Sequence, residues 1–214
     1  MENIEEKSCI DCGYANCNKM DRSYNDFCMT THMDDQVLSE AMASYKGEDT
    51  KIAVAAAQVE SENYCKMTRI EEIMEFAKKL GFKKIGIATC VGLLSEARTA
   101  AKIFRAHGFE VFGVGCKAGA VPKASVGIPK ECENVGVNMC NPILQAKLLN
   151  HHHTQLNVVI GLCVGHDSLF YRHAEALTTT LIAKDRVLGH NPAAALYQAN
   201  GYYAKLLEGE RPQK

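Results

Sequence analysis

Three short apolar segments of this chain each run into a cysteine that lies close to glycines. They are Lys83 to Cys90, Phe109 to Cys116 and Leu156 to Cys163, with the sequences KKIGIATC, FEVFGVGC and LNVVIGLC. Their almost continuous apolar character is typical of strands that are buried on both faces of a parallel sheet. A fourth candidate strand is TTTLIAK, from Thr178 to Lys184.

Segments with helical patterns precede these strands and alternate with them. Such alternation predicts an α/β fold, with a parallel sheet of about four strands and helices on both faces. One helix is expected to begin at Thr68, because Thr68 and Glu71 form a capping-box pattern, and to stop at Gly81. The other expected helices span 34–45, 49–64, 93–107 and 141–150, and a last one runs from Asn191-Pro192 to about Leu207.

The first 33 residues differ from the rest of the chain. They hold four cysteines and few aliphatic residues. The sequence therefore predicts a Cys-rich metal-binding segment at 1–33, followed by an α/β domain at 34–214.

Ten cysteines among 214 residues are the main chemical feature of the composition. The N-terminus lacks the basic and apolar regions of a signal peptide, so we expect a cytoplasmic protein, in which disulfides are disfavoured. Metal, cluster or thiol chemistry is then expected, although some cysteines can be small buried hydrophobes. With 24 basic and 25 acidic side chains, no nucleic-acid partner is expected, and no apolar run is long enough for a membrane span.

The strand-end cysteines are expected to share one site. Because ligands of parallel sheets bind beyond the carboxyl ends of the strands, Cys90, Cys116 and Cys163 should lie on one rim. Cys140 is a fourth candidate, since it precedes the helix start at Asn141-Pro142, where the thiolate form of a cysteine is favoured. Cys65 and Cys132 remain unassigned.

A second group of cysteines has the spacing Cys9-x2-Cys12-x4-Cys17-x10-Cys28. Four closely spaced thiolates on a segment without a core are typical of a metal-ordered loop. The spacing is not that of a standard zinc ribbon, and both zinc and an iron–sulfur cluster remain open.

Polar residues near the third and fourth strand ends are candidate catalytic groups. Cys163 and His166 could form a nucleophile and its base, or His166 could serve a cluster as ligand or proton donor, or simply cap a helix beside Asp167. Lys184 and Arg186 suit an anionic ligand, although an ordinary solvated loop would look the same.

Four of these motifs resemble one protein family. CVGHDSLF (163–170), KDRVLGHNP (184–192), CNPI (140–143) and CKAG (116–119) are similar to the family called domain of unknown function 1847, over nearly the whole chain and including the N-terminal cysteines. The resemblance implies a metal-binding protein of the kind common in anaerobic bacteria and archaea, without implying a reaction.

Three functional hypotheses follow, and they leave open whether the protein is an enzyme. The first is an iron–sulfur protein, with [4Fe-4S] clusters on the N-terminal cysteines and at the rim, where His166, Asp167 and Lys184 would assist small-molecule redox or sulfur chemistry. A small-molecule ligand and a redox partner protein are its expected partners. The second is a non-enzymatic zinc-binding module, and the third is a cysteine-dependent hydrolase or transferase using Cys163 and His166. The oligomeric state is left open, because the helices near 36–64 could pack on the sheet or on a second subunit.

Overall fold

The fold is taken from a computed structural model, which describes residues 7–19 and 23–208. The chain divides into two compact units, Met1–Val54 and Ala55–Lys214, and the division falls inside one helix, α3 (Glu48–Asn63). The boundary expected after residue 33 stays a prediction.

The first unit consists of short helices joined by loops. They are η1 (Cys9–Asp11), η2 (Asn16–Asn18), α1 (Met29–His32), α2 (Asp35–Ser44) and the start of α3. Asp34 caps α2, because its side chain accepts a hydrogen bond from the Gln36 N–H over 2.8 Å. None of the described residues before Ala55 is buried, which agrees with the expectation that a hydrophobic core does not organise the cysteine-rich segment.

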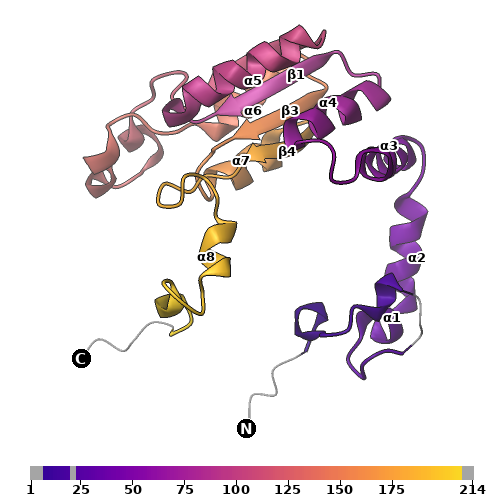
Figure 1. The fold of residues 1–214 in the computed structure, drawn as a ribbon. Helices are drawn as coiled ribbons and strands as arrows, with labels where there is room; N and C mark the ends of the chain where they lie inside the picture. The colour runs from indigo at the N-terminus through magenta and orange to yellow at the C-terminus, as the bar shows by residue number, and fades with distance from the viewer. Residues whose placement is uncertain (1–6, 20–22, 209–214) are drawn as a thin grey trace. The chain divides into compact units, whose positions relative to one another are not determined.

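The second unit is built on a four-stranded sheet in the order β2-β1-β3-β4, in which every pairing is parallel. Figure 1 shows these strands with helices around them. The α/β fold predicted from the sequence is therefore confirmed. The strand bounds are β1 (Lys84–Thr89), β2 (Glu110–Gly115), β3 (Leu156–Ile160) and β4 (Leu177–Ile182).

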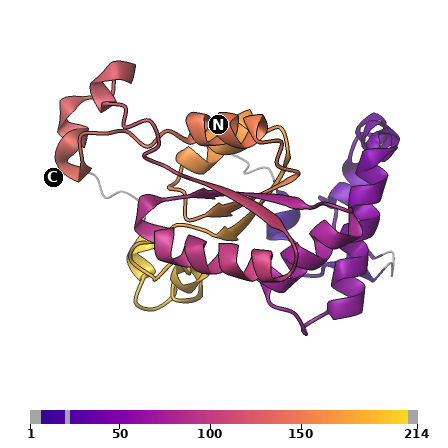
Figure 2. The same ribbon diagram turned by 90° about the horizontal axis from the view of Figure 1, so that it is seen from above.

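Alternate residues of the central strands face two separate cores. Ile85 and Ile87 of β1 belong to one core, whereas Ala88 belongs to the other. This follows from the two-residue period of a strand, which sends successive side chains to opposite faces of a sheet. Both faces of the sheet are therefore covered, as Figure 2 shows.

Two helices cover each face. Helices α4 (Arg69–Lys79) and α5 (Leu94–Ala106) supply apolar side chains to the first core, and α6 (Pro142–His151) and α7 (His166–His173) supply them to the second. The expected capping box is present at the start of α4, where Glu71 Oε2 accepts hydrogen bonds from the backbone N–H and the hydroxyl of Thr68.

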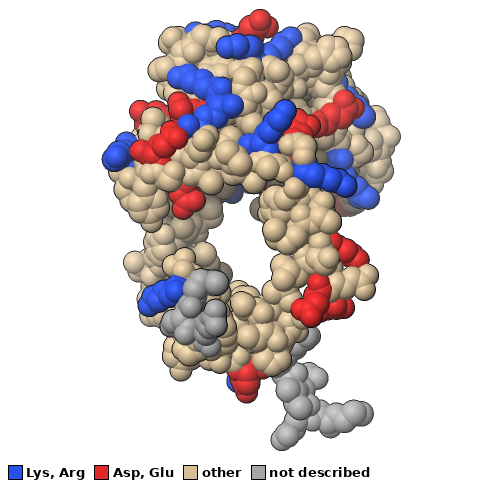
Figure 3. All heavy atoms as spheres, turned by 90° about the vertical axis from the view of Figure 1, so that its right-hand side faces the viewer, with Lys and Arg blue, Asp and Glu red and all other residues tan. Residues whose placement is uncertain are grey.

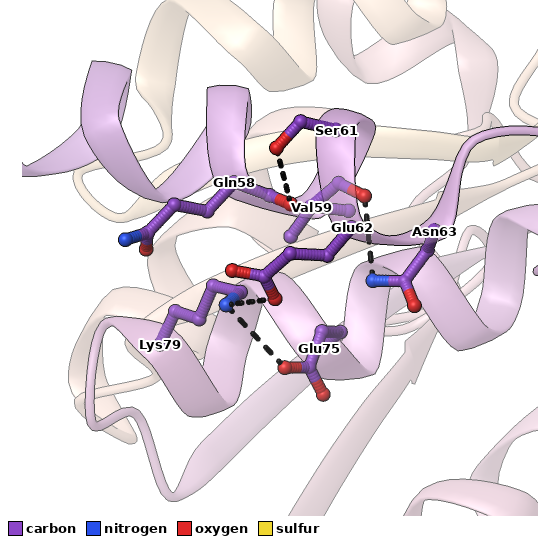
Figure 4. Close-up of polar contacts among 7 residues, drawn as sticks. All are labelled: Gln58, Val59, Ser61, Glu62, Asn63, Glu75 and Lys79. Carbon is purple, nitrogen blue, oxygen red and sulfur yellow. Dashed lines mark hydrogen bonds and ion pairs between the residues drawn. The ribbon is translucent and has the colours of Figure 1, made fainter.

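The C-terminal part of α3 is joined to α4 by an ion pair. Lys79 Nζ lies 2.7 Å from Glu62 Oε2 of α3 and 3.8 Å from Glu75 Oε1 of its own helix, as Figure 4 shows. At the other end of α4, Arg69 Nε donates to the Thr180 carbonyl of β4 over 2.6 Å. These contacts attach α4 to its neighbours on both sides.

The prediction of one long last helix up to Leu207 is wrong. The structure has only α8 (Ala193–Tyr197) and a 3-10 turn, η6 (Ala204–Leu206). Turns at Gln198 separate the two, because its carbonyl accepts from the N–H groups of Gly201 and Tyr203. Apolar side chains there stay exposed, including Leu196 and Tyr202, so no packing face stabilises a continuous helix.

The sequence led us to expect neither a membrane span nor a nucleic-acid partner. Within the described part of the chain, no helix has the length and apolar character to cross a membrane. Lys and Arg side chains lie beside Asp and Glu side chains on the face drawn in Figure 3, in keeping with the balanced charge of the sequence.

Candidate functional site

The strand register brings the cysteines that follow the strands to one edge of the sheet. Gly115 of β2 and Ile160 of β3 both pair with Thr89 of β1. The next residues continue this alignment, since the Cys116 N–H donates to the Thr89 carbonyl over 2.8 Å and the Cys90 N–H to the Ile160 carbonyl over 3.2 Å. We call Cys90, Cys116, Cys140 and Cys163 the cysteine rim.

Cys116 is the central and most buried member of the cysteine rim, with 2% of its surface exposed. Its Sγ accepts a hydrogen bond from the Val91 N–H over 3.4 Å. Burial, helped by the neighbouring Cys140 and Cys90, raises the pKa of the Cys116 thiol to about 12. Cys116 therefore interacts with two other rim thiols and is protonated at neutral pH.

Cys140 is brought to Cys116 by the chain between them. The N–H of Asn141 donates to the Cys116 carbonyl over 2.8 Å, and the Asn141 side chain caps α6 by accepting from the Leu144 N–H over 2.9 Å. The predicted helix start after Cys140 is thus confirmed. It anchors this loop-borne cysteine beside a strand end.

Cys90 has a more polar environment than Cys116. The Gly92 N–H donates to its Sγ over 3.4 Å, and the Lys184 ammonium also interacts with it. Burial is the largest influence and acts to raise the pKa of Cys90, but Gly92, Lys184 and the Cys116 thiol together hold that pKa below its ordinary value. Lys184, a candidate catalytic residue, thus lies at the rim.

Cys163 has a cationic partner, Arg186, which the sequence analysis named only as suited to an anionic ligand and did not pair with a cysteine. Arg186 Nη2 donates to the Cys163 Sγ over 2.9 Å. This hydrogen bond and the charges of Cys163, Cys90 and Cys140 raise the pKa of Arg186 above its ordinary value. The Arg186 guanidinium therefore interacts electrostatically with three rim thiols. A basic residue shortly after the last strand was the only signal for it.

His166 and Asp167 begin α7, three and four residues after Cys163. Their backbone N–H groups donate to the Cys163 carbonyl over 2.9 and 3.1 Å. Burial, followed by the charge of Lys117, holds the pKa of His166 below its ordinary value, and Asp167 opposes this shift. His166 is therefore neutral at pH 7. Within the described residues no hydrogen bond joins the His166 ring to Cys163, so the nucleophile–base pairing stays a prediction.

Gln145 of α6 is a further rim-supporting residue that the sequence did not reveal. It is fully buried, and its Nε2 donates to the carbonyls of Thr89 and Val114 over 3.1 and 2.7 Å. These carbonyls lie just before Cys90 and Cys116. Little in the sequence pointed to it, because α6 also carries the polar residues Lys147 and Asn150.

The N-terminal cysteines lie in the first unit. Cys9 and Cys17 are exposed, and Cys12 and Cys28 are partly exposed. The backbone N–H groups of Ala15 and Tyr14, with the Asn25 side chain, favour the thiolate and lower the pKa of Cys12. Donors directed at a sulfur are also what a metal-bound thiolate requires.

The metal prediction concerns both groups of cysteines. Within residues 7–19 and 23–208, no three His, Cys, Asp or Glu side chains are already arranged as a metal site. The chemistry of the rim nevertheless fits a soft metal, since its members are thiols and two of them, Cys116 and Cys90, accept hydrogen bonds from backbone N–H groups. Cys65 and Cys132 are both exposed and lie outside the cysteine rim.

Two comparisons place the sequence among known proteins. The family described as "Protein of unknown function (DUF1847)" matches residues 28–181. The uncharacterized protein MJ0455 of Methanocaldococcus jannaschii is 49% identical over 165 residues, covering 77% of this chain and 84% of that protein. The family match includes the cysteine rim and Cys28. It is shorter than the resemblance expected from the sequence, because Cys9, Cys12, Cys17 and the segment after Leu181 lie outside it.

Proposed function

The chain belongs to the DUF1847 family, and from the chemistry of its cysteine rim we propose that it is an iron–sulfur protein with an open ligand position. Cys90, Cys116 and Cys140 would hold the cluster. The observation that carries the proposal is the geometry of the strand ends, where β1 and β2 stop in register just before Cys90 and Cys116 and the Asn141 N–H, next to Cys140, donates to the Cys116 carbonyl over 2.8 Å. When bound, such a cluster supplies electron transfer and a soft Lewis-acidic iron.

The ligand number follows from the different surroundings of the four thiols. Cys116 interacts with Cys90 and Cys140, whereas Cys163 is hydrogen-bonded to Arg186. Three thiolates from Cys90, Cys116 and Cys140 would leave one position for a small molecule. The proposed substrate class is therefore a small molecule that undergoes a redox or sulfur-transfer step.

Charge near the rim supports a thiolate-bound cluster in preference to a neutral site. Three ionised cysteines carry three negative charges, and Lys184 and Arg186 interact with the rim thiols. The N–H groups of Val91 and Gly92 already point at two of the sulfurs. Such donors stabilise sulfur-borne charge and tune a cluster's reduction potential. Neutral His166 would accept or return a proton at its ring nitrogen.

The proposal is tested by anaerobic purification of the full-length protein, with iron, zinc, acid-labile sulfide and visible absorbance measured on one sample. Iron with matching sulfide and broad visible absorbance is expected. Cys90→Ser, Cys116→Ser and Cys140→Ser should each lower the rim iron and sulfide. The exposed Cys65→Ser and Cys132→Ser variants are the matched controls and should retain both.

Two results would overturn the rim cluster. One is stoichiometric zinc without sulfide, which would favour the zinc-binding module. The other is unchanged iron and sulfide in all three rim variants. Because we also propose a separate N-terminal site on Cys9, Cys12, Cys17 and Cys28, its iron is assigned by difference with a Cys12→Ser variant, in which the rim contribution should remain.

A second candidate function is supported by the bond between Arg186 and Cys163. A cationic donor stabilises a thiolate, which is the nucleophilic form of cysteine. In a metal-free protein Cys163 would then act as the nucleophile of a hydrolase or transferase. One hyper-reactive thiol that disappears in Cys163→Ala, in protein without iron or zinc, would favour this function over the cluster.

A further inference from the structure

A groove lies on the α4–α5 face of the sheet, between α5 and the edge strand β2. Its volume is about 320 Å³, which lies at the small end of the range for ligand sites of proteins. Its floor comes from β1 and β2, and its wall is formed by α5. Thr89 and Gly115 line one end, and they directly precede Cys90 and Cys116 of the rim.

Two glycines create this groove. Gly113 and Gly115 pair with Ile87 and Thr89 of β1, so they face the same side of the sheet as the first core. Without side chains they leave the floor open. Gly113 is solvent-exposed although it lies in the middle of a strand.

The strand backbone itself does not require these glycines. Neither has a positive φ, and a Cβ at Gly113 would have its nearest neighbour at 3.7 Å, an ordinary contact. Glycine inside a strand is destabilising, and it often marks a place where a ligand approaches the backbone closely. The space above Gly113 is therefore the observation that points to a ligand.

The wall of the groove is cationic. Arg98, Lys102 and Arg105 follow one another along the groove-facing side of α5. Arg105 Nη2 donates to the Val111 carbonyl over 3.2 Å. In the described parts of the chain none of the three forms an ion pair, and no acidic residue lines the groove. The positive charge is thus available to a ligand.

We infer that this groove binds a small organic anion, whose apolar body lies over Gly113 and whose anionic group meets Arg98 and Lys102. The volume suits a molecule of small-metabolite size. Binding itself does not depend on the rim metal. The further role of this anion as the substrate of the rim, which Thr89 and Gly115 would place near Cys90 and Cys116, rests on the proposed function.

The test compares two dyes that differ only in the presence of one sulfonate group, which carries a negative charge. 8-Anilinonaphthalene-1-sulfonate has an aromatic body with a sulfonate, and N-phenyl-1-naphthylamine has the same body without it. Fluorescence titration of the full-length protein should give saturable binding of the anionic dye, and about tenfold weaker binding of the neutral one, as expected when charge-assisted contacts are lost.

Two variants locate the binding site. Gly113→Val fills the floor with a strand-favouring side chain and should weaken binding of both dyes at least about tenfold. The double variant Arg98→Gln/Lys102→Gln should weaken only the anionic dye. Glu110→Val, on the opposite face of β2, and Arg172→Gln, on α7, are the matched controls and should bind like the natural protein.

The inference is overturned if Gly113→Val binds the anionic dye normally, or if the charge variant does. It is also overturned if the controls weaken binding as much as the groove variants do. Titration of Cys90→Ser separates this proposal from the cluster. Loss of rim metal with retained dye binding leaves the groove intact, whereas dye binding lost in Gly113→Val with the metal retained places the ligand outside the rim.

Discussion

The side-chain amide of Gln145 donates a hydrogen bond over 3.1 Å to the carbonyl of Thr89, the residue that precedes Cys90. The same nitrogen donates to the Val114 carbonyl, close to Cys116. Gln145 lies on α6, which begins just after Cys140. One buried amide therefore links the helix and the two strands that carry three rim cysteines.

Replacement of this amide should disturb both stability and the rim. Gln145→Ala removes two buried hydrogen bonds and leaves a cavity, so we expect a loss of about 2–4 kcal/mol in the free energy of unfolding. Bound metal should also fall. Urea unfolding and metal analysis of the same samples measure both effects.

Gln155→Ala is the matched control for Gln145→Ala. The Gln155 side chain accepts from the N–H groups of Lys83 and Lys84 at the opposite end of β1. It is exposed, so its removal should cost less and should leave the metal content unchanged. Equal metal loss in both variants would show that Gln145 has no special role at the rim.

The rim thiols should react at very different rates in metal-free protein. The pKa of Cys90 is lowered and that of Cys116 is raised to about 12, and only the thiolate is alkylated. At pH 8, iodoacetamide should therefore modify Cys90 well before Cys116, as followed by mass spectrometry of peptides. The folded state should lose stability between about pH 9 and 12, because the unfolded chain ionises Cys116 first. Equal alkylation rates of Cys90 and Cys116 would contradict the difference between their thiol pKa values.

Arg186→Gln should reduce the reactivity of Cys163. The thiolate loses a charge-assisted hydrogen bond, and since Arg186 is solvent-exposed, we expect alkylation of Cys163 at pH 7 to slow by roughly threefold to tenfold. The rate is measured for Cys163 by peptide mass spectrometry. Arg172→Gln, which removes an equal charge on α7, should leave that rate unchanged, and an equal decrease in both variants would indicate a general charge effect.

Two glycines in neighbouring strands should respond in opposite ways to alanine. A Cβ on Gly86 would lie 2.3 Å from Asn157 Oδ1, which is buried and accepts from Thr154. Gly86→Ala should therefore destabilise the fold by about 1–3 kcal/mol. Gly113→Ala has room and should be neutral or stabilising by up to about 1 kcal/mol. Thermal unfolding tests both, and a loss in Gly113→Ala comparable to that in Gly86→Ala would contradict the open groove floor.

The capping box of α4 should contribute to stability in a pH-dependent way. Hydrogen bonds from Thr68 lower the pKa of Glu71. The stability that they contribute is therefore fully present above the pKa of Glu71 in the unfolded chain, about 4.3, and is lost as the pH falls through the pKa in the folded state. Thr68→Ala should cost about 1 kcal/mol at pH 7 and less at about pH 3. Urea unfolding at both pH values measures this.

Thr99→Ala is the control for the capping residue. Thr99 lies inside α5 and donates to the Ser95 carbonyl, so it supports no helix end. We expect no loss of stability at either pH, because alanine is the better helix former. If Thr68→Ala lost the same stability at both pH values, the pKa of Glu71 would not depend on the hydrogen bonds from Thr68.

Local patterns explain why much of this fold could be predicted from the sequence. The apolar run around Ile85 and Ile87 and the glycine–cysteine endings determine where strands form and stop. The Thr68–Glu71 pattern marks the start of a helix through contacts only three residues apart. The last helix could not be predicted in this way, because residues around Leu196 lack the packing face that would stabilise it.

The sequence by itself determined the α/β class and the position of three cysteines at strand ends, since side-chain period and strand length are local properties. Only the tertiary structure decided that Cys116 is the buried centre of the rim, that Arg186 reaches Cys163, and that Gly113 opens a groove. These relationships join residues that are distant in sequence. They depend on strand order and helix packing, which no single segment encodes.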